Sequence, residues 1–368
     1  MIRISKKDEL NSWKSALVRI SAVLSAIIFS AVMIAAMGYN PFQTFDAMVK
    51  GSIGTAFGIK NSVSIAIPYL VAALGVSIAF RMKFWNIGAE GQIVMGAVAA
   101  TYVTRIMSQD TNGIILIVCM GIGGMVGGAL WALVPALFKA FSKTNETLFT
   151  LMLNYIAIKI TLYLRSVIWR DPKAMGFPRV EVIPVQARLP KIFGVHIGWI
   201  VALILVVIVY VFIKYTKKGY EIQVVGESDK TAHYAGINVK KVLITGVLLS
   251  GALAGLTGML KLNGMSYSLS ESIGAGDGFT AIIIAWLSGL SAPVMVFVSF
   301  FFAAMKQGAM AIEVRMGISS SVAEIIQGMI LFSALASEFF IRYKVVFDIK
   351  RRYVKRAASI KEGGETDE

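Results

Sequence analysis

The chain has 368 residues, of which 57% are apolar and only 15% are charged. Soluble domains carry about 25% charged residues, so this composition excludes an ordinary soluble protein. Each helix that spans a bilayer needs roughly 20 apolar residues, and we therefore predict an all-α polytopic membrane protein in contact with a lipid bilayer. The net charge of +15 would favour nucleic acid as a partner of a soluble chain. In a membrane protein it reports first on topology, and we expect no nucleic-acid partner.

Ten apolar runs, bounded by charged or turn residues, follow one another along the chain, and we expect each to span the membrane. They cover residues 20–37, 62–80, 87–102, 113–137, 148–164, 198–213, 242–260, 279–290, 293–304 and 321–341. The first run has no A-x-A-like cleavage site, so we interpret it as a retained span rather than a cleaved signal peptide.

Positive charge predicts the orientation of these spans. With a cytoplasmic amino terminus, 23 of the 36 Lys and Arg residues fall inside and 12 outside, while Lys159 lies within a span. The positive-inside rule therefore favours the cytoplasm for both termini. Residues 165–191 contradict the rule locally, because this outer segment holds six of the twelve outside charges.

The third and eighth spans begin in the same way, with an acidic residue followed by glycine: Glu90-Gly91 in one and Asp277-Gly278 in the other. This pattern is typical of a helix that is interrupted near its amino end. Spans two to five then recur as spans seven to ten. Because this offset of five is odd, we predict two inverted-topology repeats with broken helices, an arrangement typical of transporters.

The expected organisation has six parts. They are an amino-terminal cytoplasmic segment with the first span and an outer connector (1–61), the first repeat (62–167), an outer segment with span six (168–213), a cytoplasmic loop (214–241), the second repeat (242–342) and a cytoplasmic tail (343–368).

The cytoplasmic loop contains the signals of a short helix. Ser228 or Asp229 can cap a helix through Ala232 and Tyr234, and Gly236 lies where a helix ends in a left-handed residue. Such a helix fits a groove on a soluble partner, whereas the alternative is an ordinary solvated connector.

Polar residues near the third span are candidates for a substrate pathway. Glu90 and Gln92 lie where a polar group without partners is costly, although Glu90 could instead cap backbone amides at the helix break. Trp85 and Asn86 precede the break, and an aromatic ring beside an amide can stack on and hydrogen-bond a nucleobase. For Trp85 the alternative is an interfacial anchor.

Amides also occur in the fifth and tenth spans, at Asn154 and Gln327. An amide offers both donors and acceptors, which suits an uncharged, hydroxyl-rich solute, and the alternative is a contact between helices. Phe279 and Trp286 are seven residues apart on one helix face, where they either line the path or pack.

Other residues have mainly structural interpretations. Glu324 shares a helix face with Gln327, and we expect it to pair with Lys306 or Lys159. Gly123, Gly124, Gly127 and Gly128, and likewise Gly251 and Gly255, form small-xxx-small frames that let helices approach closely.

No catalytic or metal site is expected. His196 and His233 are the only histidines and are too far apart in the sequence for a metal site. Cys119 lies in a Gly-rich apolar span, where packing is its expected role. The pattern contains no cluster of nucleophile, base and orienting residue, so we expect no enzymatic activity.

Four segments together resemble one known family. They are FWNIGAEGQIVMG (84–96), NETLFTLMLNYIA (145–157), TAHYAGINVKK (231–241) and EIIQGMILF (324–332). They resemble the permease subunits of bacterial ABC importers of the branched-chain amino acid, ribose and nucleoside superfamily. Segment 145–157 makes the nucleoside (guanosine-type) branch the most similar one, and the resemblance extends over residues 62–341.

This resemblance implies a transport subunit of the bacterial plasma membrane that binds no cofactor itself. ATP and magnesium would bind a separate ATPase subunit, and this chain indeed has no G-x-x-x-x-G-K-[ST] phosphate loop. The ATPase would dock on residues 227–241. Residues of this loop that the resemblance assigns to coupling are Glu227, Ala232, Tyr234, Ala235, Gly236 and Ile237.

The resemblance also implies a second, related permease in a heterodimer and an extracytoplasmic substrate-binding lipoprotein. We expect Arg170, Lys173 and Arg179 to dock an acidic face of that binding protein, which would explain the basic outer segment.

Together these observations predict ATP-driven import of nucleosides. The expected pathway residues are Trp85, Asn86, Glu90, Gln92, Asn154, Phe279 and Gln327. Three alternatives stay open: a permease for ribose or another simple sugar, a secondary transporter that works alone, and a membrane scaffold without a transported solute. Secondary transporters also use inverted repeats and broken helices, so the fold does not separate them from importers.

Overall fold

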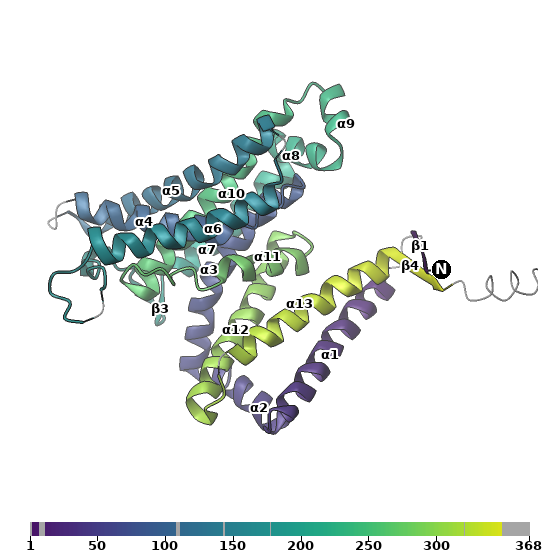
Figure 1. The fold of residues 1–368 in the computed structure, drawn as a ribbon, viewed down its shortest axis with the longest axis horizontal. Coiled ribbons are helices and arrows are strands. Elements are labelled where there is room, and N and C mark those ends of the chain that lie inside the picture. Colours follow the sequence, from purple (N-terminus) through teal and green to yellow (C-terminus); the bar gives the residue numbers. More distant parts are fainter. Residues whose placement is uncertain are drawn as a thin grey trace, which may run out of the picture. The chain divides into compact units, whose positions relative to one another are not determined.

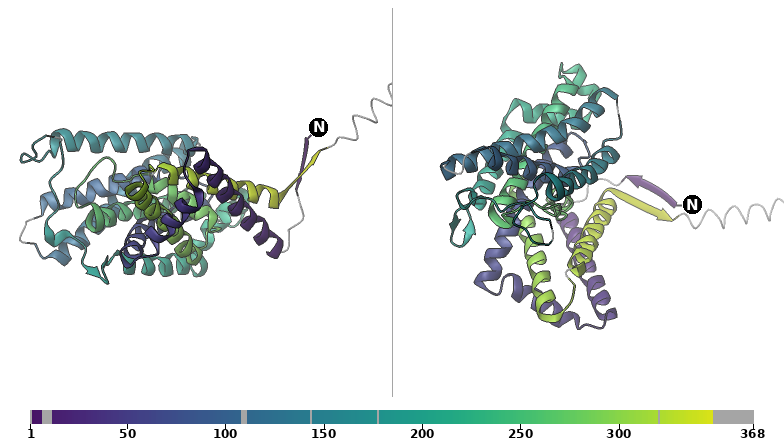
Figure 2. Two further views of the ribbon diagram at one scale, coloured as in Figure 1. Left: turned by 90° about the horizontal axis from the view of Figure 1, so that it is seen from below. Right: turned by 60° about the vertical axis from the view of Figure 1, so that its left-hand side comes forward.

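The structure is a computed structural model that describes residues 2–6, 12–107, 111–142, 144–176, 178–319 and 321–347. The chain forms two compact units. One consists of Asp46–Ser320, and the other combines Met1–Phe45 with Ser321–Glu368. Each unit is described by itself (Figures 1 and 2).

The smaller unit pairs the two ends of the chain. Helix α1 (Ser12–Ala36) packs against α13 (Ser321–Arg342), and strand β1 (Ile2–Lys6) pairs antiparallel with β4 (Tyr343–Phe347). At the helix contact the buried hydroxyl of Ser30 donates to the carbonyl of Ala26 at 2.7 Å. This back-bonding satisfies the hydroxyl within its own helix, as is common for serine among apolar side chains. Helix α2 (Pro41–Ser52) follows α1.

The larger unit is a bundle of packed helices (Figure 1). Helix α3 (Ala56–Arg81) is the central one, since 89% of its apolar window is buried. Around it lie helices α7 (Gly198–Tyr215), α10 (Val239–Lys261), α11 (Asp277–Leu287) and α12 (Ala292–Met316), while α4 (Ala89–Ile106) packs on α10. Helix α5 (Gly113–Ser142) packs on α4 and α10.

Glycines allow α4, α5 and α10 to cross closely, as the small-xxx-small frames predicted. A Cβ at Gly255 of α10 would overlap the carbonyl of Gly124 and the backbone of Gly128 in α5. Gly123 and Gly127 instead lie against α4, where an added Cβ would meet Val103 and the backbone or side chains of Ala99 and Met95. Such close backbone contacts provide packing and require residues without side chains.

The remaining elements lie at the periphery or at the ends of this unit. Helix α6 (Glu146–Tyr163) continues into the π-helical turn η1 (Leu164–Ile168), and α10 into the π-helical turn η3 (Leu262–Ser266). Helix η2 (Val185–Ala187) and the hairpin of β2 (Lys191–Ile192) and β3 (Val195–His196) precede α7 (Gly198–Tyr215). Helices α8 (Lys217–Glu227) and α9 (Asp229–Tyr234) lie at the end opposite the loop that follows η1 (Figures 1 and 2).

Six helices of the described residues are long and apolar enough to cross a membrane. They are Ala56–Arg81, Gly113–Ser142, Glu146–Ile168, Gly198–Tyr215, Val239–Ser266 and Ala292–Met316, and the bent pair Leu24–Ala36 with Pro41–Ser52 makes a possible seventh. The ten runs predicted from the sequence all contribute to helices. However, the number of ten spans and the inverted repeats are not confirmed: α4 carries Glu90, Gln92 and Arg105, and α11 has only 11 residues.

Candidate functional site

The break between α3 and α4 is closed by a buried amide network. The Asn86 side chain is completely buried and donates to Gln92 Oε1 at 3.0 Å and to Ser250 Oγ at 3.1 Å. Its Oδ1 accepts from Gln92 Nε2 at 3.0 Å and from the backbone N–H of Gly88 at 3.1 Å. These contacts use the full hydrogen-bonding capacity of the Asn86 amide. Asn86 and Gln92 thus stabilise the start of α4 against α10.

Asn154 of α6 extends this network. Its Oδ1 accepts from the N–H of Gly91 at 2.8 Å, and its Nδ2 donates to the carbonyl of Ile87 at 2.9 Å. The N–H groups of a first helical turn have no partner within their helix, so Asn154 satisfies one of them from a neighbouring helix. Only 2% of Asn154 is exposed.

Glu90 caps the amino end of α11. Its carboxylate accepts from the backbone N–H of Gly276 at 3.0 Å and of Gly278 at 2.8 Å. An anion at a helix N-terminus is favoured by the unpaired N–H groups and by the helix dipole. A Cβ at Gly278 would overlap the backbone of Glu90, so the amino ends of α4 and α11 meet directly. The structure therefore contains the capping contact considered as the alternative for Glu90.

The second acidic residue at this junction is part of an ion-pair cluster. Asp277 is 2% exposed and pairs with Lys261 of α10 and with Lys306 of α12, whose Nζ lies 3.1 Å from Oδ1. Two cations therefore neutralise a carboxylate that would be costly to bury alone. Lys306 thus pairs with Asp277, because α12 presents Lys306 to the start of α11. The expected pairing of Glu324 with Lys306 or Lys159 joins residues of different units and stays a prediction.

Aromatic rings gather beside the break. Trp85 stacks on Trp286 of α11, with ring centroids 5.5 Å apart and an interplanar angle of 8°, and meets Phe80 edge-on at 5.3 Å. Trp85 is still 39% exposed, and Phe279 of α11 is 42% exposed. Trp85 thus has a packing role in this arrangement and also an accessible face.

The structure brings Asn86, Glu90, Gln92 and Asn154 together, each at most 4% exposed. Gln327 belongs to α13 in the other unit, and its side chain lies outside the described residues. Each of these four buried residues has a structural contact in this arrangement, and their role in a substrate pathway stays a prediction.

The short helix predicted after Ser228 is confirmed as α9. Ser228 is its N-cap and accepts from the N–H of Thr231 at 3.3 Å, while Gly236 adopts a φ of 71° after its end. The N–H of Ile237 donates to the carbonyl of Ala232 at 2.9 Å, which closes the helix end. Ala232 is fully buried, whereas Tyr234 is 93% exposed. Glu227 and Ala235 are also exposed, so α9 presents a polar surface anchored by one alanine.

Residues that sequence reasoning missed connect this helix to the break. A Cβ at Gly226 would overlap the carbonyl of Arg81 at the end of α3, and Lys83 donates to the carbonyl of Glu227 at 3.2 Å. The end of α8 is therefore packed against the residues that precede Asn86. A glycine near the end of α8, shortly before the Ser228 cap, was the available signal, but only the fold shows what it contacts.

The three basic docking candidates lie on one short loop after η1. Arg170 bridges antiparallel to Val180, and Arg179 Nε lies 3.3 Å from Asp171 Oδ2. Arg170, Lys173 and Arg179 are all exposed.

In the hairpin of β2 and β3 that follows, the Phe193 side chain is 84% exposed, whereas His196 is only 2% exposed. Burial and the nearby Lys191 lower the pKa of His196 to about 4, so its ring is neutral at pH 7.

Residues 58–335 match the family described as the permease component of branched-chain amino acid transport systems. The chain belongs to this family. Its members are transport components, so this chain is a multi-pass membrane permease and not an enzyme.

Three relatives are similar to this permease over most of their length. The glucose ABC transporter permease protein of Haloferax volcanii is 29% identical over 95% of both chains. The guanosine ABC transporter permease protein NupP of Bacillus subtilis is 30% identical over 89% of this chain and 94% of its own. The nucleoside ABC transporter permease protein NupB of Lactococcus lactis is 27% identical over 96% of this chain and 99% of its own.

Proposed function

We propose that this permease translocates nucleosides as the membrane subunit of an ATP-driven importer. The observation that carries this proposal is the similarity to two relatives named for nucleosides, NupP and NupB, over 89% and 96% of the chain. The amides of Asn86, Gln92 and Asn154 are paired with one another or with the backbone in this structure. They would offer donors and acceptors to an uncharged solute in a state in which those contacts are exchanged.

A simple sugar is the second candidate substrate. The relative named for glucose covers 95% of this chain at 29% identity, which is close to the identity with NupP. Ribose is equally uncharged and rich in hydroxyls, so the side chains of the site do not separate the two classes.

ATP binding and hydrolysis would occur, with magnesium, on a separate ATPase subunit. We propose residues 227–237 as its docking element, with Tyr234 as the exposed contact and Ala232 and Ile237 as internal anchors. A protruding capped helix fits a groove on a soluble partner. Because α8 contacts Arg81 and Lys83, a displacement of this element would reach the α3–α4 break directly.

The transport cycle would interconvert two states of the membrane helices. ATP binding shifts their equilibrium only if the ATPase binds one state better than the other. In this proposal Trp85, Asn86, Glu90, Gln92, Asn154, Phe279 and Gln327 line or gate the path. The buried contacts of Asn86 and Glu90 would stabilise one of these two states. The other state would form when these contacts are replaced by different ones.

The proposed assembly has a second, related permease as a heterodimer partner and a substrate-binding lipoprotein outside. Bacillus subtilis provides a precedent for two permeases, since NupP and NupQ are both named guanosine permeases and both resemble this chain. We further propose ten spans in two inverted repeats, in a bacterial plasma membrane with both termini in the cytoplasm.

Uptake by reconstituted proteoliposomes tests the function. The complete set of subunits should import guanosine when ATP is supplied to the ATPase, and the permease alone should import nothing. Uptake of glucose or ribose in place of nucleosides would move the assignment to sugars. Nucleoside transport by the permease alone along a proton or sodium gradient would establish a secondary transporter instead.

The outer docking loop has a separate test. Replacing Arg170, Lys173 and Arg179 together with Glu should weaken delivery by the binding protein while membrane insertion stays normal, because an attractive surface becomes repulsive. Lys50→Glu, in the outer connector, serves as the control. Unchanged uptake by the triple variant would refute the docking role.

A further inference from the structure

One exposed helix face of the larger unit carries a charge near the middle of a membrane span. Lys159 lies in the helical stretch Glu146–Ile168, thirteen residues after its start and nine before its end. At 1.5 Å per residue it is about 20 Å from one end and about 14 Å from the other. Its side chain is exposed and forms no ion pair or hydrogen bond with another of the described residues.

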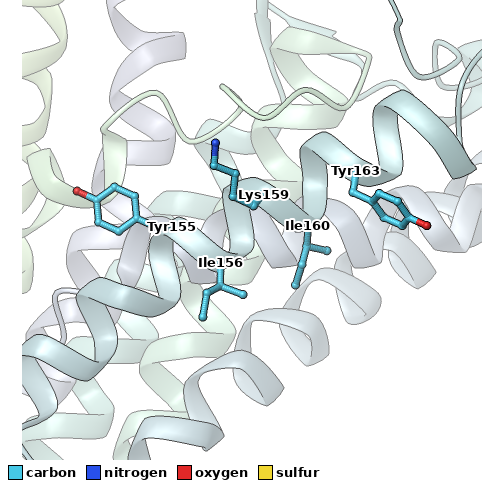
Figure 3. Close-up of a pocket in the computed structure, with 5 residues that line it drawn as sticks. All are labelled: Tyr155, Ile156, Lys159, Ile160 and Tyr163. Atoms are coloured by element: carbon cyan, nitrogen blue, oxygen red, sulfur yellow. The ribbon is translucent and has the colours of Figure 1, made fainter.

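Two tyrosines flank this lysine at helical spacing. Tyr155 and Tyr163 lie four residues before and after Lys159, and they are 64% and 56% exposed. With Ile156 and Ile160 they line a shallow groove of about 400 Å³ (Figure 3). We call these five residues the Lys159 face. Figure 3 shows the ammonium pointing away from Ile156 and Ile160, with one tyrosine on each side along the helix.

The exposed face of α5 is different. Its outward residues Val118, Ile122, Val126 and Leu130 are all aliphatic and 50–58% exposed, as a lipid-facing helix requires. An ammonium group at mid-span is costly against lipid tails, and ionisable residues in spans usually face a bundle interior or a water-filled cavity. Lys159 is also too far from either end of its helix to reach the membrane surface easily.

We propose that the Lys159 face lines the aqueous substrate pathway and contacts the solute. This inference rests on the proposed function. The ammonium group offers three donors to carbonyl and hydroxyl oxygens, and the tyrosines offer hydroxyl groups and rings on which a planar base can stack. An uncharged nucleoside provides both kinds of partner. The buried amides near the α3–α4 break then position α6, while the opposite side of α6 meets the substrate.

Thiol labelling tests where this face points, and the single native cysteine makes the test simple. In a Cys119→Ala background, Lys159→Cys and Tyr163→Cys are compared with Ile122→Cys and Val126→Cys on α5. A charged, membrane-impermeant methanethiosulfonate reagent is added to the fully assembled transporter in membrane vesicles of both orientations. We expect labelling at positions 159 and 163 at least tenfold faster than at 122 and 126. Guanosine should slow it several-fold.

Slow labelling at 159, equal to that of the α5 positions in both orientations, would overturn the proposal. It would mean that this face is covered by protein, for example by a helix of the proposed second permease. Fast labelling that guanosine leaves unchanged would overturn the contact with that solute. If glucose protects in its place, the pathway assignment holds and the nucleoside assignment fails.

Uptake by variants provides the second measurement. Lys159→Met keeps the length of the side chain without its charge, and Lys159→Arg restores a cation. We expect Lys159→Met to raise the KM for guanosine at least fivefold with normal assembly, and Lys159→Arg to recover part of this loss. Wild-type guanosine uptake with an unaltered KM in Lys159→Met would refute the inference while leaving the proposed function intact.

Discussion

Asn154 and Lys159 lie five residues apart on α6, and their polar groups have opposite environments. The Asn154 amide is 2% exposed and has backbone partners on α4 and the preceding loop. Lys159 is exposed on the other side of the helix, between two tyrosines. Polar residues within a span can therefore be present for two different reasons. Asn154 replaces missing backbone hydrogen bonds, whereas Lys159 requires water or a polar solute.

The largest expected effect concerns the buried side of this comparison. Asn154→Leu leaves the N–H of Gly91 and the carbonyl of Ile87 without their partner, and each such buried group costs about 1–3 kcal/mol. We expect a loss of about 3 kcal/mol in stability, measured by thermal unfolding in detergent. Lys159→Met should change stability by less than about 0.5 kcal/mol. Equal losses in both variants would contradict the distinction between the two sides of α6.

Removal of the Glu90 charge should have the next largest effect. Glu90→Gln keeps an acceptor but loses charge-assisted bonds to two backbone N–H groups, so we expect a loss of about 2 kcal/mol. The matched control is Glu181→Gln, at an exposed position. If the thermal transitions of the two variants coincide, the cap at α11 contributes nothing to stability.

A methyl group at Gly226 tests the connection between α8 and the α3–α4 break. Because a Cβ there would overlap the carbonyl of Arg81, we expect Gly226→Ala to cost about 1–2 kcal/mol and to reduce ATP-driven uptake several-fold. In Gly121→Ala the new methyl group would have only Leu256 nearby, at 3.9 Å, so this variant should retain activity. Uptake by Gly226→Ala at the level of Gly121→Ala would rule out this mechanical connection.

His196 provides the smallest expected effect, on a buried group outside the spans. Its folded pKa of about 4 lies below the ordinary value of 6.5, so the unfolded state binds a proton first as the pH falls. Stability from this group is therefore complete above pH 6.5 and is lost between 6.5 and 4. Between pH 7.5 and 5.5 we expect a loss of about 1 kcal/mol. The same titration of His196→Gln should lack this component, and an unchanged pH profile in that variant would assign it to other groups.

Local signals predicted the parts of the fold that depend on neighbouring residues. The Ser228 cap and Gly236 predicted the bounds of α9, and the glycine frames predicted close helix packing. The acidic residue and glycine predicted helix interruptions, and they lie in the first turns of α4 and α11. Two short antiparallel pairs were missed, because strands of two or five residues leave little periodicity to recognise.

The contacts within the candidate site could not be predicted from such local signals. The contacts of Glu90 with Gly276 and Gly278 join residues 186 and 188 positions apart, and the bond from Asn86 to Ser250 spans 164 positions. No spacing rule connects residues at these separations. The same limit applies to Lys306, whose ion pair with Asp277 at the start of α11 was not among the expected pairings.

The sequence by itself determined the class of molecule, the positions of its apolar helices, the capped α9 and the similarity to permeases, because these follow from composition and from contacts within a few residues. The tertiary structure decided which polar residues are buried and satisfied, how the ends of α4 and α11 meet, and that Lys159 remains exposed. The physical reason is that a polar group within a span must find a partner, and only the folded chain shows whether another helix provides it.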